Sequence, residues 1–148
     1  MKPVDYCQAA KRHFTDAELL MDSMRHANAG HLYGFVAECG IKSLLIWNGY
    51  TADPVTGEID KEKKLEKNFR THADDLVSKI NMIHTFLDGR GAAKYLAMIP
   101  NVGCFSNWHT AHRYYIESAL PSSVSDWRDA AREVMNMLDA AMLDGVTI

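Results

Sequence analysis

The sequence predicts an all-α protein, and three observations carry this prediction. Residues 29–49 form the longest apolar segment of the chain, and its apolar side chains fall on every side of a 3.6-residue helix. Segments on both sides of it repeat apolar residues at steps of three and four. No segment shows the alternation of a half-buried strand. At 148 residues, the chain is long enough for one domain, residues 1–148, with a core of its own.

We expect residues 29–49 to form a central helix that its neighbours bury on all sides. The small residues Gly34, Ala37 and Gly40 would let other backbones come close. Gly49 is a natural C-terminal stop. The pattern therefore predicts a helix around which the others pack.

The first predicted helix precedes this one and covers about residues 4–28. Its apolar side chains share one face, with charged residues on the other. They are Ala10, Phe14, Ala17, Met21 and Met24. Asn28, Ala29 and Gly30 are expected to break the helix, so that the first two helices form an antiparallel hairpin.

The chain beyond Gly49 predicts a connection followed by further helices. Residues 50–71 contain turn pairs and a charged run of mixed sign, which is typical of an exposed connection with room for one helical turn over 61–68. A third helix is expected from His72, with Thr71 as its N-cap and an apolar face through Leu76, Ile80, Ile83 and Leu87. A short helix follows over 92–99, stopped by Pro100.

Two further segments complete the prediction. One begins near Ser106 or Asn107 and runs to Pro121. The last helix begins at Ser122 or Ser123, with Asp126 as its capping-box partner, and ends at Gly145.

Composition narrows the possible functions. A net charge of −3 gives no support to nonspecific nucleic-acid binding, and no DNA binding is indicated. Three widely spaced cysteines, Cys7, Cys39 and Cys104, indicate reduced thiols and a cytoplasmic protein. The N-terminus lacks the order of a secretory signal, and the longest apolar run is too short and too charged to span a membrane.

One polar stripe crosses the central helix. His31, Glu38 and Lys42 are seven and four residues apart and share one line along the helix. Glu before Lys at this spacing is the favourable order for an ion pair. The stripe therefore predicts either an internal ion pair or the lining of a groove or subunit interface.

A second cluster lies in the segment after Ser106. As a helix, it would place Trp108, His112 and Tyr115 on one face, and His109 and Arg113 on the next. Aromatic rings with an arginine can stack on a base and hold its phosphate, although a half-buried helix edge would carry the same residues.

A metal site is the weaker interpretation of the histidines. His109 and His112, with His72 or His84, could meet at a metal, but no acidic residue stands at the matching helical positions. We therefore predict no metal and no cofactor.

The order of these features resembles the HEPN domains, which are similar to the helical C-terminal domain of kanamycin-type nucleotidyltransferases. The resemblance covers nearly the full chain. It rests on residues 34–45, which read GFVAECGIKSLL, on His72-x-x-Asp75-Leu76, on Trp108, and on Arg113-Tyr114 before a final amphipathic helix. It implies an up-and-down bundle of four to five helices that commonly dimerises, with a polar groove between the second and later helices.

The resemblance also implies site residues. The Glu and Lys of the family's second helix fall on Glu38 and Lys42, its helix-opening His on His72, and its Arg-Tyr pair on Arg113 and Tyr114. Family members act as ribonucleases, often as toxins in toxin–antitoxin pairs, or as nonenzymatic nucleotide- or substrate-binding partners.

The ribonuclease branch of the family carries a histidine four to six residues after an arginine. No histidine follows Arg113 in that window, while Arg25 and His31 have the right separation but straddle the predicted break. The resemblance therefore favours a noncatalytic module.

We accordingly predict a module that binds a nucleotide, a small anion or a partner protein, as a homodimer and with a minimal nucleotidyltransferase in a toxin–antitoxin-type pair. Its expected ligand-binding residues are His31, Glu38, Lys42, His72, Trp108, Arg113 and Tyr114. The alternative is a metal-independent ribonuclease that uses His109, His112 and Arg113, with the histidines before the arginine instead of after it. A plain dimerisation or interaction unit with a structural polar stripe is the third possibility.

Overall fold

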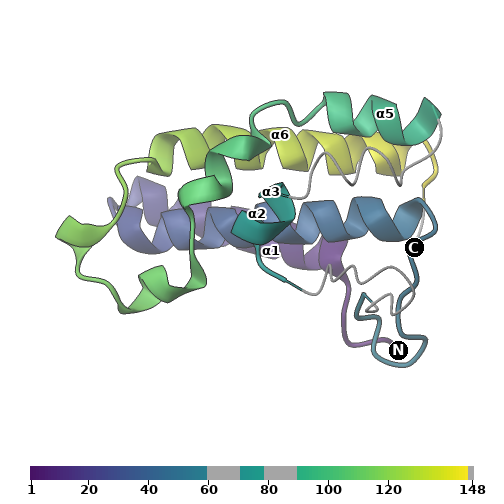
Figure 1. Cartoon of the computed structure of the whole chain (residues 1–148), viewed down its shortest axis with the longest axis horizontal. Coiled ribbons are helices and arrows are strands. Elements are labelled where there is room, and N and C mark those ends of the chain that lie inside the picture. Colours follow the sequence, from purple (N-terminus) through teal and green to yellow (C-terminus); the bar gives the residue numbers. More distant parts are fainter. Residues whose placement is uncertain (60–70, 79–89, 147–148) are drawn as a thin grey trace.

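The computed structural model describes residues 1–59, 71–78 and 90–146. This part of the chain is mostly helical and contains no strand (Figure 1). Its helices are α1 (Tyr6–Asp22), α2 (His26–Trp47), α3 (Ala73–Ser78), α5 (Arg90–Ala97) and α6 (Val124–Leu143), with 3₁₀ turns η1 (Val102–Asn107), η2 (Thr110–Tyr114) and η3 (Glu117–Ala119). The predicted all-α helical bundle is confirmed, while its HEPN-likeness stays a prediction.

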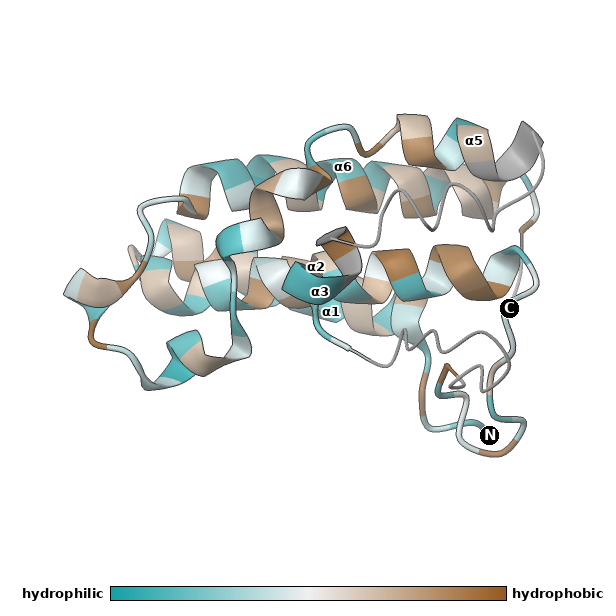
Figure 2. Cartoon of the chain, viewed as in Figure 1, coloured by the Kyte–Doolittle hydropathy of each residue, from teal (hydrophilic) through white to brown (hydrophobic). Residues whose placement is uncertain are grey.

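Helix α2 is the centre of the bundle, as its sequence predicts. It packs against α1 and α6, and its residues from Val36 to Leu45 are buried without interruption. Figure 2 shows that its C-terminal half is coloured mainly hydrophobic. The ends of the neighbouring helices meet near its last turn, where Cys7 of α1 and Met142 of α6 lie 3.9 Å apart at their sulfur atoms.

Glycines in α2 allow this close packing. A Cβ atom on Gly34 would lie 2.0 Å from Cε2 of Trp108, and one on Gly40 would lie 2.1 Å from Cγ1 of Val134. Both distances are far below van der Waals contact, so the indole and the valine occupy the space of the missing side chains. The glycines do permit close approach to α2, but the groups that approach are the side chains of Trp108 and Val134, not the backbones that the sequence predicts.

The break between the first two helices lies earlier than Asn28 to Gly30, so that prediction is wrong. Helix α1 ends at Asp22, and Met24 turns the chain with a φ of 59°, in the left-handed region that non-glycine residues rarely adopt. Ala29 and Gly30 are buried within α2. A Cβ on Gly30 would lie 3.0 Å from Cε3 of Trp127, so the small residues mark contact with α6, not a turn.

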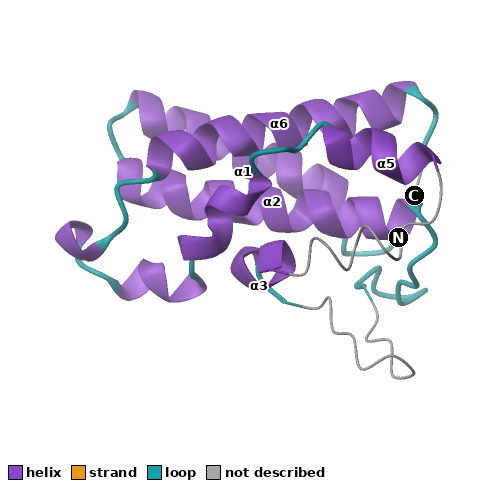
Figure 3. Ribbon diagram, turned by 45° about the horizontal axis from the view of Figure 1, so that its top comes forward, coloured by secondary structure: helices purple, strands orange, loops and turns teal. Residues whose placement is uncertain are grey.

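The segment after Ser106 is not one helix, which corrects the predicted sharing of faces. Extended residues interrupt it at Trp108 and His109 and again at Tyr115 and Ile116, leaving the three short 3₁₀ turns. These turns project beside the N-terminal half of α2 (Figure 3). Trp108 is completely buried, while Tyr115 is exposed.

Helix α6 begins after Ser123 as expected, but the predicted capping box does not form. The Ser123 side chain makes no cap hydrogen bond; its hydroxyl instead accepts one from the Asn107 side chain at 3.0 Å. The Ser123 hydroxyl thus bonds a distant residue and not the first backbone N–H groups of α6.

Other predicted features have mixed outcomes. Helix α3 opens with Asp74 and Asp75 in its first turn, but Thr71 is not adjacent to its first residue, Ala73. The possible turn over 61–68 and the apolar positions Ile80, Ile83 and Leu87 lie outside the described residues. The short helix predicted over 92–99 is found as α5.

Among residues 1–59, 71–78 and 90–146, no helix has the length and apolar character that a bilayer crossing needs. The three cysteines are unpaired.

Candidate functional site

Three of the predicted site residues form a polar cluster, in which Glu38 and Lys42 are buried and His72 is half exposed. The Lys42 ammonium donates to Oε1 of Glu38 at 2.7 Å, and Nδ1 of His72 lies 3.1 Å from Oε2 of the same carboxylate. The side chains of Lys42 and Glu38 are only 8% and 11% exposed. Lys42 also lies 5.5 Å from the ring centre of Tyr6. Of the two interpretations of the polar stripe, this geometry is that of the internal ion pair.

His31 lies two turns before Glu38 and belongs to an aromatic cluster. Its ring stacks on Trp108 with centroids 5.3 Å apart and meets Phe35 edge-on at 5.0 Å. Residues seven apart on a helix are about 10 Å apart along its axis. The polar stripe is therefore divided between the ion-pair cluster and the aromatic cluster.

The remaining predicted residues, Arg113 and Tyr114, lie on the outside. Tyr114 is 76% exposed, and the Arg113 guanidinium lies over its ring at 4.8 Å. In the described part of the chain, neither residue forms a hydrogen bond or ion pair with Glu38 or Lys42, so the seven residues do not line a single groove.

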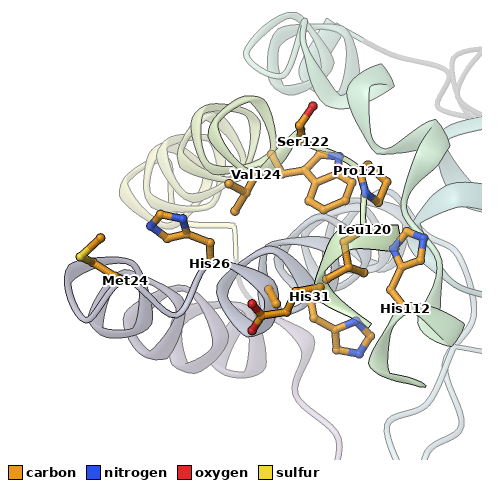
Figure 4. Close-up of a pocket in the computed structure, with 11 residues that line it drawn as sticks. Met24, His26, His31, His112, Leu120, Pro121, Ser122 and Val124 are labelled. Atoms are coloured by element: carbon orange, nitrogen blue, oxygen red, sulfur yellow. The ribbon is translucent and has the colours of Figure 1, made fainter. Parts of the chain in front are cut away.

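A cavity of about 440 Å³ opens beside His31, between the start of α2, the 3₁₀ turns and the start of α6 (Figure 4). Imidazoles from His26, His31 and His112 line it, together with the Glu117 carboxylate. Its other lining residues are Met24, Ala27, Leu120, Pro121, Ser122, Val124 and Trp127. Its size and its mixture of apolar and polar groups are typical of small-molecule sites.

The histidines in this cavity are electrostatically coupled. Burial lowers the pKa of His31, and the charges of Arg113, His112 and His72 lower it further. Burial also lowers the pKa of His112, with His109 adding to the effect and Asp74 opposing it. Both rings are therefore mainly neutral at pH 7, next to groups that carry or can acquire positive charge.

His109 has a carboxylate partner that sequence reasoning missed. Its Nδ1 lies 2.7 Å from Oδ2 of Asp74, at the start of α3. The ring also meets His112 edge-on, with centroids 5.4 Å apart. Asp74 and His109 are 35 positions apart in the sequence, and no spacing rule connects a helix N-terminus with a later 3₁₀ turn.

A metal site was the weaker interpretation of these histidines. Among residues 1–59, 71–78 and 90–146, no three His, Cys, Asp or Glu side chains come together in a way that could hold a metal ion. His84, one of the possible ligands, lies outside the described residues.

Comparison with known proteins identifies no relative: no family model matches the chain, and neither does a curated protein or a solved structure. The HEPN resemblance thus rests on the sequence features alone.

Proposed function

We propose that this protein is a noncatalytic helical module that binds a small anionic ligand, with nucleotides as the foremost class. The observation that carries the proposal is the cavity beside α2, where His31 and His112 meet an apolar wall formed by Leu120, Val124 and Trp127. Imidazole groups can hydrogen-bond an anion, while the wall can cover a base. This location replaces the expected groove at Glu38 and Lys42, whose charged atoms already bond each other.

The electrostatic surroundings support an anionic ligand. Besides burial, the positive charge of Arg113 disfavours protonation of His31. A bound anion would be attracted by the same field. Glu117 is the opposing charge in the cavity, and it suits a ligand that also carries hydroxyl or amino donors, as nucleotides do.

The HEPN resemblance supports a partner. On that basis we propose a homodimer that acts with a minimal nucleotidyltransferase in a toxin–antitoxin-type pair. The exposed side chains of Tyr114 and Ile116, 76% and 72% accessible, are available for such contacts.

A ligand screen tests the proposal. Thermal unfolding and calorimetry of the purified protein are measured with nucleoside mono-, di- and triphosphates, with the nucleosides as controls that lack phosphate. We expect phosphorylated ligands to raise the melting temperature in a concentration-dependent way, because a ligand that binds only the folded state stabilises it. Absence of stabilisation across the whole series would remove the proposal.

The second candidate function is the metal-independent ribonuclease, which the Asp74–His109 contact favours. A carboxylate that accepts from Nδ1–H of His109 leaves its Nε2 free as a general base for a ribose hydroxyl. Arg113 would then stabilise charge on the phosphate. Cleavage of single-stranded RNA that is lost in His109→Ala, His112→Ala and Arg113→Ala would establish this function instead.

A further inference from the structure

We infer that the cavity binds the phosphate group of an organic phosphate ester at the N-terminus of α6, with Nε2–H of His112 as its principal side-chain donor and His31 as a second. The inference rests on the proposed function and deepens it, because it gives the ligand a location, an orientation and a chemical class.

The start of α6 provides backbone donors. The first N–H groups of a helix have no partner within it, and the helix dipole favours a negative charge there. In α6, which is 20 residues long, the Ser123 side chain makes no hydrogen bond to these groups, although it accepts one from Asn107. Ser122 and Val124, on either side of this N-cap, line the cavity. Asp126 of the first turn lines a different hollow, beside Cys104.

His112 is an independent indication of a ligand at the same place. The residue is only 8% exposed, and its Nδ1 accepts the backbone N–H of His109 at 3.4 Å. An accepting Nδ1 carries no proton, so Nε2 of the neutral ring must be the protonated nitrogen. In the described part of the chain, Nε2 has no hydrogen-bond partner, although the ring lines the cavity. His112 therefore offers a fixed, unused donor.

The neutral His31 ring is also protonated on Nε2, as its buried Nδ1 indicates. Its Nδ1 is buried without any partner. A buried N–H without an acceptor is rarer in proteins than a buried acceptor without a donor, so the proton belongs on Nε2. Two neutral imidazoles thus present N–H donors and no fixed acceptor, which suits an oxyanion better than a cation or an amine.

The rest of the cavity indicates an ester, not free phosphate. Leu120, Pro121 and Trp127 form a wall too apolar for an inorganic ion to contact usefully. Glu117 would repel a bare dianion but can accept from a hydroxyl or amino group of a larger ligand. A nucleoside monophosphate combines these three parts, with the base on the wall and the phosphate at α6.

Two amide variants of His112 test the assignment. Asn at this position keeps an acceptor near Nδ1 for the His109 N–H but removes the cavity donor, whereas Gln places an amide N–H near Nε2. Both variants lose the ring that stacks on Trp127, and they differ from each other by one methylene. Calorimetry measures the binding of adenosine 5′-monophosphate, adenosine and inorganic phosphate to each.

We expect the wild type to prefer the monophosphate to both adenosine and inorganic phosphate. His112→Asn should weaken monophosphate binding by about tenfold or more, the effect of one hydrogen bond to a charged group, while His112→Gln should stay within about threefold. Equal affinities in wild type and His112→Asn would overturn the assignment but leave the proposed function standing. If no phosphorylated ligand binds the wild type, the proposed function fails as well.

A measurement on the unaltered protein covers the case in which a variant does not fold. In a ¹H–¹⁵N NMR titration with adenosine 5′-monophosphate, the amides of residues 124–126 and the His112 ring should shift together. Shifts confined to Glu38, Lys42 and His72 would place the ligand elsewhere and overturn the inference.

Discussion

Both oxygens of the Glu38 carboxylate are already engaged within the protein, one by Lys42 and the other by His72. Ionised side chains are rarely buried unless paired, and here each charge has its partner. Binding an external phosphate through Lys42 would break this pair inside the bundle. At the scale of single residues, the Glu38–Lys42 part of the polar stripe is therefore explained by helix packing.

Breaking the pair from one side should be strongly destabilising. Glu38→Gln leaves the Lys42 charge buried, and Lys42→Met leaves the Glu38 charge buried; each should cost about 3 kcal/mol of unfolding free energy. The double variant should recover most of this loss, because no unpaired charge remains. Urea denaturation at pH 7 measures all three.

Lys94→Met is the matched control for this cycle, since Lys94 pairs with Asp144 at an exposed site. It should change stability little. Additive losses in the double variant would show that Glu38 and Lys42 do not act as a pair.

At the scale of elements, the position of Trp108 depends on a glycine in another segment. The indole lies against the backbone of α2 at Gly34, and it also stacks on His31, which lines the cavity. Trp108 comes from the extended break between η1 and η2. The contact therefore fixes the 3₁₀ turns, and with them His112, relative to α2.

Gly34→Ala should displace this arrangement. Its Cβ would lie 2.0 Å from Cε2 and 2.2 Å from Nε1 of Trp108, and a completely buried indole has little room to move. We expect a loss of about 2 kcal/mol, typical of overpacking, and a change in tryptophan fluorescence.

Gly103→Ala is the control, since a Cβ there meets nothing within 4 Å. It should leave both stability and fluorescence unchanged. If Gly34→Ala is as stable as the wild type, the close approach of Trp108 is not a constraint.

At the scale of the whole molecule, the sequence predicts the long helices well because their apolar faces are periodic and local. Prediction from the sequence fails where a contact between distant segments determines the local structure. The sequence predicts that Gly30 breaks a helix, whereas in the structure it makes room for Trp127. The sequence also predicts Ser123 as a helix cap, whereas its hydroxyl accepts a hydrogen bond from Asn107. The cavity depends on such contacts throughout. Of its lining residues, His31 was expected to bind a ligand and His112 was an alternative catalytic residue, whereas Glu117 carried no sequence signal.

Glu18 of α1 forms ion pairs with two arginines of α6, Arg128 and Arg132, and so joins the first and last helices of the bundle. Glu18 of α1 accepts two hydrogen bonds from Arg128 of α6, at 2.8 and 2.7 Å, and a third from the Tyr33 hydroxyl of α2 at 2.6 Å. The hydrogen bond from Arg128 is the main reason why the pKa of Glu18 falls to about 2. Burial acts in the opposite direction and raises this pKa, while the hydrogen bond from Tyr33 lowers it further. Three helices thus meet at one carboxylate.

Glu18→Gln should therefore destabilise the protein in a pH-dependent way. The pKa of Glu18 is about 2 when folded and near 4.5 when unfolded, so the unfolded state binds more protons as the pH falls. The stabilisation by ionised Glu18 is complete above about pH 4.5 and is lost as the pH falls towards 2. Because the site is partly exposed, we expect a difference from wild type of only about 1 kcal/mol at neutral pH.

Urea denaturation of the wild type and Glu18→Gln between about pH 7 and about pH 3 checks this. The difference in their unfolding free energies should narrow below the pKa that Glu18 has in the unfolded state. Asp139→Asn, at an exposed position of α6, is the control and should show no such narrowing. A difference that stays constant with pH would mean that the Gln variant acts through packing. It would also mean that the contact between Glu18 and Arg128 does not hold α1 to α6 through charge.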